Sequence, residues 1–236
     1  MGRTPDLHQG HRDRLKERFR QKGLDGFAPV NVLELLLFFC VPQGDTNVLA
    51  HELLERFGSL AQVLEAPVEE LEKVKGVGKH ASTLLSLVPA LSRYYLVSRN
   101  EHRDILTTTD ECGEYLMDYF VGQKDEVVFL LCLDSKCKVL CCKEVARGNV
   151  NSAGISIRRI VEIALSVNAV SVVLSHNHPG GLAVPSNEDI LTTRRVAVAL
   201  DAVGIVLADH IVVADDDFVS MVQSDFYSPD ACRLIV

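Results

Sequence analysis

The sequence lacks a long apolar run and any repetitive tract. The apolar stretch LELLLFF at residues 33–39 is far shorter than the roughly 20 residues that cross a membrane. The first residues are polar and charged, unlike a secretory signal peptide. No repeat of fixed period and no low-complexity segment occurs along the 236 residues. The sequence therefore predicts a cytoplasmic protein without membrane contact, long enough for one large domain or two small ones.

A disulfide framework and a thiolate metal site are also missing. The seven cysteines are odd in number, and an even set at regular spacing is typical of disulfide scaffolds. Four of them lie close together in apolar segments without C-x2-C spacing: Cys132, Cys137, Cys141 and Cys142. We interpret these four as small buried hydrophobic residues rather than metal ligands, and the whole set as reduced thiols.

The chain has no strong excess of positive charge. Its net charge is −8. Residues 1–100 contain 13 Lys and Arg against 12 Asp and Glu, which gives +1. Residues 101–236 contain 11 Lys and Arg against 20 Asp and Glu, which gives −9. The basic excess is concentrated in residues 1–22, with seven basic and three acidic side chains. This asymmetry indicates two modules, of which only the first would favour a polyanion.

The spacing of apolar residues changes once along the chain, from a helical period to a mixture of helical and strand periods. Up to residue 98 almost no β-branched alternation occurs, which predicts an all-helical module at 1–98. Its helices are expected at 10–22, 30–40, 45–58 and 59–66, followed by a helical segment at 67–96 that contains a Gly-rich turn. Asp45 or Thr46 suits the start of the third helix, and Gly58 its end. The polar segment 99–106 is the predicted linker to a second domain at 107–236.

The second domain mixes helices and strands. Helices are predicted at 108–120, 156–168 and 186–204, and strands at 126–134, 138–146, 169–179, 205–215 and 218–224. The fold class is therefore α/β (α+β), with an all-helical module in front of a mixed sheet.

The stretch VSVVLSHNHPGGLAVPSNED at 170–189 carries the clearest chemical signal. Side chains repeat every two residues in an extended chain, so His176 and His178 point to one side. Asp189 could supply a third ligand after the Gly- and Pro-rich turn, as catalytic zinc requires. The same letters also match an S-x-x-D capping box with Ser186 as N-cap, in which case the histidines are ordinary loop residues. The residues alone leave both interpretations open.

The spacing His-x-His-Pro, six residues, then Ser-x-x-Asp is similar to the metal-binding core of the JAB/MPN fold, the JAMM motif. The surrounding RGNVNSAGISIRRIVEIALSVNAVSVVLSHNHP and the downstream ADHIVV resemble the RadC branch of that fold. The helical module at 1–98 also resembles RadC proteins, in the segments GHRDRLKERF, LELLL and HELLERFGSLAQVLEAPVEELEKVKGVGK. The resemblance covers nearly the whole chain and implies a layered architecture like that of cytidine deaminases. Gly180 stands where the family often has serine, and SIRRI replaces a proline-containing helix start.

The resemblance implies a role for each matching residue. His176, His178 and Asp189 would ligate zinc, and Ser186 would help to hold a developing oxyanion. The family also needs a glutamate as general base on an earlier strand. Glu126, which follows the domain's first helix and leads into a strand, fits better than Glu144, although either could be merely a solvated charge.

The implied function is that of a zinc-dependent metallopeptidase or amidase acting on an unknown peptide or isopeptide through a metal-activated water. The alternative is a DNA-repair-associated DNA-binding factor or a metal-dependent nuclease. The segment VKGVGKHA at 74–81 resembles a helix-hairpin-helix turn that meets a DNA phosphate. Lys75, Gly76, Gly78 and Lys79 would make that contact, although a charge of +1 is low for a DNA binder. His210 is predicted to be structural or to support the metal site from behind. The oligomeric state is not predicted.

Overall fold

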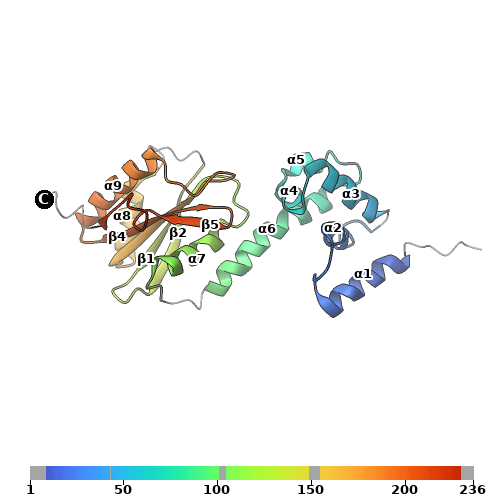
Figure 1. The fold of residues 1–236 in the computed structure, drawn as a ribbon, viewed down its shortest axis with the longest axis horizontal. Helices are drawn as coiled ribbons and strands as arrows, with labels where there is room; N and C mark the ends of the chain where they lie inside the picture. The colour runs from blue at the N-terminus through green and yellow to red at the C-terminus, as the bar shows by residue number, and fades with distance from the viewer. Residues whose placement is uncertain (1–8, 43, 101–104, 149–154, 230–236) are drawn as a thin grey trace, which may run out of the picture. The chain divides into compact units, whose positions relative to one another are not determined.

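A computed structural model describes residues 9–42, 44–100, 105–148 and 155–229. The chain divides into two compact units between Leu91 and Ser92, the first helical and the second containing the sheet (Figure 1). The predicted fold class, a helical front followed by a mixed α/β domain, is confirmed. Within the described ranges, no helix combines the length and the apolar character that a membrane crossing needs.

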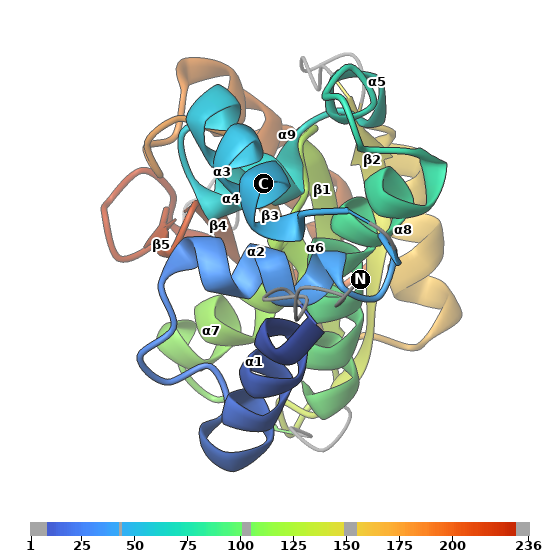
Figure 2. The ribbon, with the colours of Figure 1, turned by 90° about the vertical axis from the view of Figure 1, so that its right-hand side faces the viewer.

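The helical unit contains α1 (Gln9–Lys22), α2 (Pro29–Leu37), α3 (Thr46–Phe57), α4 (Leu60–Glu65), α5 (Val68–Leu71) and the first part of α6 (Lys79–Asn100). Local capping sets several of these ends. Asp45 is the N-cap of α3 and accepts from two backbone amides, while Gly58 ends that helix with a φ of 95°. Figure 2 shows α1 and α2 in blue.

The core of the helical unit is built from the apolar faces of α2 to α6. Its fully buried residues include Leu33, Leu37, Leu53, Leu71 and Leu85. These leucines come from four different helices. Within α2, α3 and α6 the buried core residues recur at intervals of four, as in Leu33 and Leu37, Leu49 and Leu53, and Ala81 and Leu85, which is the spacing of one helical face. The apolar periodicity of the sequence therefore determines how this unit packs.

Helix α6 runs past residue 98, where the helical module was predicted to end. Residues 99 and 100 of the predicted linker are helical, and 101–104 lie outside the described residues. The end of α6 makes polar contacts within the second unit. Arg93 donates to the carbonyl of Val121 at 2.8 Å, and the Asn100 amide donates to Asp118 at 2.9 Å. These contacts come from tertiary packing, so the polar composition of the segment did not predict them.

The second unit contains α7 (Thr109–Phe120), β1 (Val127–Leu133), β2 (Val139–Arg147), α8 (Ile157–Ser166), β3 (Ser171–Asn177), α9 (Asn187–Asp201), β4 (Val206–Ala214) and β5 (Asp217–Ser220). The strands form one sheet in the order β2-β1-β3-β4-β5. Only the β3–β4 pair is parallel, and α9 is the connection between these two strands. Such a crossover helix packs on one face of the sheet.

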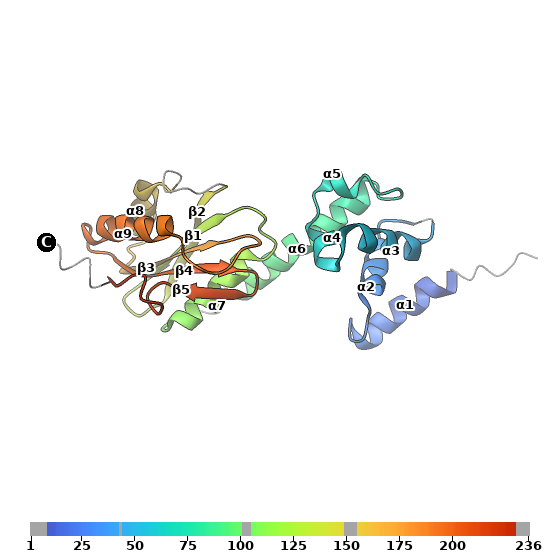
Figure 3. The same cartoon turned by 45° about the horizontal axis from the view of Figure 1, so that its top comes forward.

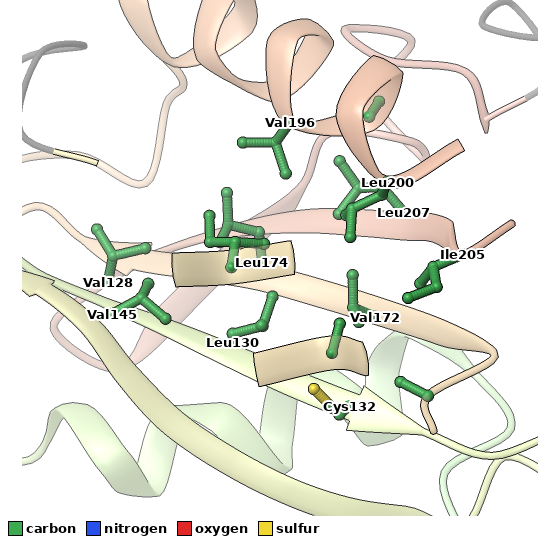
Figure 4. Packing of buried hydrophobic residues seen from close by; sticks show 14 of the residues in the cluster. Val128, Leu130, Cys132, Val145, Val172, Leu174, Val196, Leu200, Ile205 and Leu207 are labelled. Atoms are coloured by element: carbon green, nitrogen blue, oxygen red, sulfur yellow. The ribbon is translucent and has the colours of Figure 1, made fainter. Parts of the chain in front are cut away.

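The sheet is covered on both faces, which gives three layers. Helices α8 and α9 lie over one face, and α7 lies on the other (Figure 3). On the α9 face, Val196 and Leu200 pack against strand residues such as Val172 and Leu174 (Figure 4). Odd-numbered residues of β1 face α7 and even-numbered ones face α9, as the two-residue period requires.

Candidate metal centre

His176 and His178 lie at the carboxyl end of β3, at the middle of the sheet. His176 pairs with Val128 of β1 and Val212 of β4, both of which belong to the core on the α9 face. Its imidazole therefore points towards α9. His178 follows the strand, and its amide still donates to the Val213 carbonyl at 2.8 Å. The two rings lie 4.8 Å apart between centroids, so the period-two prediction for this pair holds in the structure.

Asp189 lies in the first turn of α9, where it both caps the helix and faces the histidines. Its Oδ2 accepts from the Ser186 amide at 2.7 Å and from the Ser186 hydroxyl at 2.6 Å. The Asp189 amide donates back to Ser186 Oγ at 3.2 Å, which completes a capping box. Its Oδ1 lies 3.3 Å from His176 Nε2. The capping and metal interpretations are therefore compatible, because each uses a different carboxylate oxygen.

The three side chains present their ligand atoms at the spacing that zinc requires. His176 Nε2 is 3.0 Å from His178 Nε2 and 3.3 Å from Asp189 Oδ1, and one ligand atom from each of the three side chains lies within 4.8 Å of the other two. Two ligands at about 2.1 Å from a tetrahedral ion would lie about 3.4 Å from each other. Within the described ranges, this trio is the one group of three or more His, Cys, Asp or Glu side chains arranged to hold a metal ion.

The hydrogen bond behind His178 fixes which of its nitrogens faces the site. His178 Nδ1 lies 3.0 Å from the carbonyl oxygen of Leu182. A carbonyl only accepts, so Nδ1 carries the proton and Nε2 presents a lone pair. Gly180, with a φ of 65°, turns the loop that brings Leu182 back to this position. A neutral imidazole held in this way is the form that binds a metal.

The electrostatics favour an ionised Asp189 carboxylate and a neutral His210 imidazole. Burial alone would raise the pKa of Asp189, but the hydrogen bond and charge of His176 and the hydrogen bonds from Ser186 lower it overall. Burial lowers the pKa of His210, which lies behind His176, and the charge of His176 lowers it further. His210 is therefore neutral at physiological pH. Side-chain exposure rises from 3% at His176 to 16% at Asp189 and 24% at His178, so the trio opens to solvent on one side.

The structure separates the two glutamates that were considered as general base. Glu126 immediately precedes β1, whose Val128 is opposite His176. Continuing that antiparallel register places Glu126 opposite His178 and on the same face. Glu144 is opposite Phe129, which belongs to the α7 face. Arg147 also holds it through two hydrogen bonds, of 3.0 and 2.7 Å, and lowers its pKa. Of the two glutamates, Glu126 is therefore the one on the strand face of the histidines, and its role as general base stays a prediction.

Asn177, which the sequence reasoning did not single out, connects β3 to the segment that contains Glu126. Its Oδ1 accepts from the Val127 amide at 2.7 Å, and its Nδ2 donates to the Asp125 carbonyl at 3.1 Å. These contacts lie on either side of Glu126 in the chain. The side chain is buried, so it satisfies two backbone groups at the strand end and fixes the start of β1 beside the histidines.

Two further residues connect the histidines to α9. His176 Nδ1 lies 2.8 Å from His210 Nε2, and His210 Nδ1 lies 2.5 Å from Thr193 Oγ1. Thr193 was missed because nothing in its immediate sequence marks it, although it lies one helical turn after Asp189. His210 is not an isolated structural residue, since its ring contacts a proposed ligand.

The four residues considered for DNA lie in the connection from α5 to α6. Gly76 has a φ of 99°, and a side chain at Gly78 would meet open space. Lys75 and Lys79 are exposed, and Lys79 is the first residue of α6. The acidic side chains of Glu69, Glu70 and Glu72 precede the turn, so its electrostatic field is mixed.

The clustered cysteines do not form a metal site. All cysteines of the described ranges are free thiols. Burial raises the pKa of Cys132 to about 12, with a further contribution from Cys141, which keeps it protonated and unsuited to binding a metal.

Comparisons with known proteins identify the family of this chain. Residues 106–226 match the model of the RadC-like JAB domain. The chain belongs to this family. A UPF0758 protein of Fusobacterium nucleatum is 31% identical over 223 residues, which cover 92% of this chain and 96% of that protein. A UPF0758 protein of Ruegeria pomeroyi is 35% identical over 209 residues, covering 89% of this chain and 93% of that relative. The RadC-like domain thus spans α7 to β5 and includes the His176–His178–Asp189 trio.

Proposed function

We propose that the RadC-like domain is a zinc-dependent hydrolase that cleaves an amide bond in a peptide or isopeptide. The observation that carries the proposal is that one ligand atom from each of the three side chains lies within 4.8 Å of the other two. His176, His178 and Asp189 would hold the ion. Three protein ligands with an opening to solvent are typical of catalytic zinc, whereas structural sites are normally closed by four.

Bound zinc would acidify a water molecule to a pKa of about 7 and polarise the substrate carbonyl. The chain's own residues would supply the remaining chemistry. Glu126, on the same sheet face as the histidines, would accept a proton and return it to the leaving amine. The Ser186 hydroxyl donates to Asp189 in the free protein, so stabilising a developing oxyanion would require it to turn away from that carboxylate.

Chelation tests this proposal directly. The purified chain should contain about one zinc ion, as expected for a mononuclear site, and should cleave members of a panel of internally quenched peptides and ε-lysyl isopeptides. Removing the metal with a chelator should abolish cleavage, and adding zinc back should restore it. Cleavage that persists in the metal-free chain, or failure to bind zinc at all, would contradict the proposal.

We further propose that the helical unit contacts DNA through the α5–α6 connection. The supporting observation is the open space beside Gly78 at the start of α6, which would let a phosphate approach the backbone amides there. Lys75 and Lys79 are exposed next to this opening. With only two such cations, binding would be weak and independent of sequence.

Charge reversal at the two lysines should weaken this contact. Lys75→Glu/Lys79→Glu should raise the Kd for a short DNA duplex and reduce the slope of log K against log salt by about two, because roughly one counterion is released per phosphate contact. Fluorescence anisotropy at several salt concentrations measures both quantities. The matched control is Lys124→Glu/Lys136→Glu, which changes the net charge equally at exposed positions of the other unit. Equal weakening in both variants would show only a net-charge effect and contradict a specific contact.

A further inference from the structure

A continuous line of buried contacts connects the ligand His176 to the backbone of the ligand Asp189. His176 Nδ1 lies 2.8 Å from His210 Nε2, and His210 Nδ1 lies 2.5 Å from the hydroxyl of Thr193. That hydroxyl lies 2.6 Å from the carbonyl oxygen of Asp189, one turn earlier in α9. The side chains of His176, His210 and Thr193 are all almost completely buried.

The Asp189 carbonyl, at the end of this series of contacts, determines the direction of every hydrogen bond in the series. The Asp189 carbonyl only accepts, so the Thr193 hydroxyl gives it its single proton. Thr193 Oγ1 must then accept from His210, which places the proton of that ring on Nδ1. His210 Nε2 is left as an acceptor, and His176 must donate to it from Nδ1. In the neutral ring, His176 Nε2 is then the lone pair, and it faces Asp189 and His178.

We propose that Thr193 and His210 are positioning residues that hold His176 in the tautomer required for metal binding. This inference rests on the proposed metal site. A ligand histidine commonly donates its second N–H to a carboxylate or to a carbonyl. Here the acceptor is the neutral His210, whose own orientation is fixed by Thr193 of α9. We call the hydrogen bonds from His176 through His210 and Thr193 to the Asp189 carbonyl the relay. It couples two ligands that lie 13 residues apart in the chain.

The opposite direction is excluded only while the Thr193 hydroxyl is present. Without it, His210 could carry its proton on Nε2 and donate towards His176. His176 would then accept at Nδ1 and carry its own proton on Nε2, where it would block the ion. A valine at position 193 has nearly the shape of threonine but neither donates nor accepts a hydrogen bond. The substitution therefore leaves the direction of the hydrogen bonds in the relay unspecified while it keeps most of the packing.

Zinc affinity of the full chain, measured at fixed pH by competition with a chromogenic chelator, tests the relay. Thr193→Val should weaken zinc binding about 10- to 100-fold, the usual effect of losing a partner behind a metal ligand. Thr193→Ser keeps the hydroxyl and should bind like the wild type, whereas a purely structural role of Thr193 would not distinguish the two in this way. Long-range ¹H–¹⁵N spectra of the metal-free wild type should show both His176 and His210 protonated at Nδ1.

The outcomes separate this inference from the proposed function. A Thr193→Val variant with wild-type zinc affinity, or a wild type in which His176 carries its proton on Nε2, would overturn the relay while leaving a zinc-binding wild type intact. A wild type that binds no zinc would overturn the proposed function itself. The tautomer spectrum needs neither metal nor substrate, so it still decides the direction of the hydrogen bonds in that case.

Discussion

Replacing Asp189 with alanine is expected to abolish stoichiometric zinc binding while the chain stays folded. The variant keeps both histidines but loses the carboxylate whose Oδ1 lies 3.3 Å from His176 Nε2. Two imidazoles without an anionic third ligand hold zinc much more weakly than a complete catalytic set. Metal analysis after gel filtration should give about one ion per chain for the wild type and close to none for Asp189→Ala.

The matched control for this experiment is Ser186→Ala, because the two residues share one capping box. Each substitution removes cap hydrogen bonds, and each should cost about 1 kcal/mol of stability. Only Asp189→Ala removes a proposed ligand, so only it should lose the metal. Wild-type zinc content in Asp189→Ala would mean that Asp189 is a helix cap alone and that the assignment of the ligands is wrong.

The proximity of the three side chains could be predicted from the sequence because local rules place all of them, whereas their interpretation as zinc ligands came from the resemblance to the JAMM motif. Alternation along a strand puts His176 and His178 on one side, and the S-x-x-D pattern puts Asp189 in the first turn of a helix. The turn between them is short and rich in Gly and Pro. The fold class followed from similarly local signals, since helix caps and changes of period mark where most elements begin.

The residues behind the trio depend on pairing between distant segments. His210 reaches His176 only because β4 pairs in parallel with β3, with His210 opposite Leu174. No local pattern fixes that register. Asn177 likewise contacts residues about 50 positions earlier in the chain. The sequence marked His210 as a residue of interest, but only the register shows that its ring contacts a proposed ligand.

The choice between Glu126 and Glu144 also depends on strand register, which no local pattern in the sequence fixes. In a regular strand Glu144 would share a face with Ala146, which pairs with Val128 on the α9 face. The pairing of β1 and β2 shifts between Val128 and Phe129, so Glu144 comes opposite Phe129 and faces α7 instead. One extra residue in β2 therefore removes Glu144 from the site, and the composition of that strand does not reveal it.

Glu126→Gln is accordingly expected to lower kcat by about 10²- to 10⁴-fold while zinc remains bound, because an amide cannot accept the proton that a general base takes. The ε-lysyl isopeptides and quenched peptides of the cleavage panel supply the rates, and metal analysis of the same samples supplies the zinc content. Glu144→Gln is the matched control. It should lose at most about 1 kcal/mol of stability from an exposed ion pair with Arg147 and keep its rate. The reverse result, an inactive Glu144→Gln beside an active Glu126→Gln, would place the base on the α7 face and contradict the register argument.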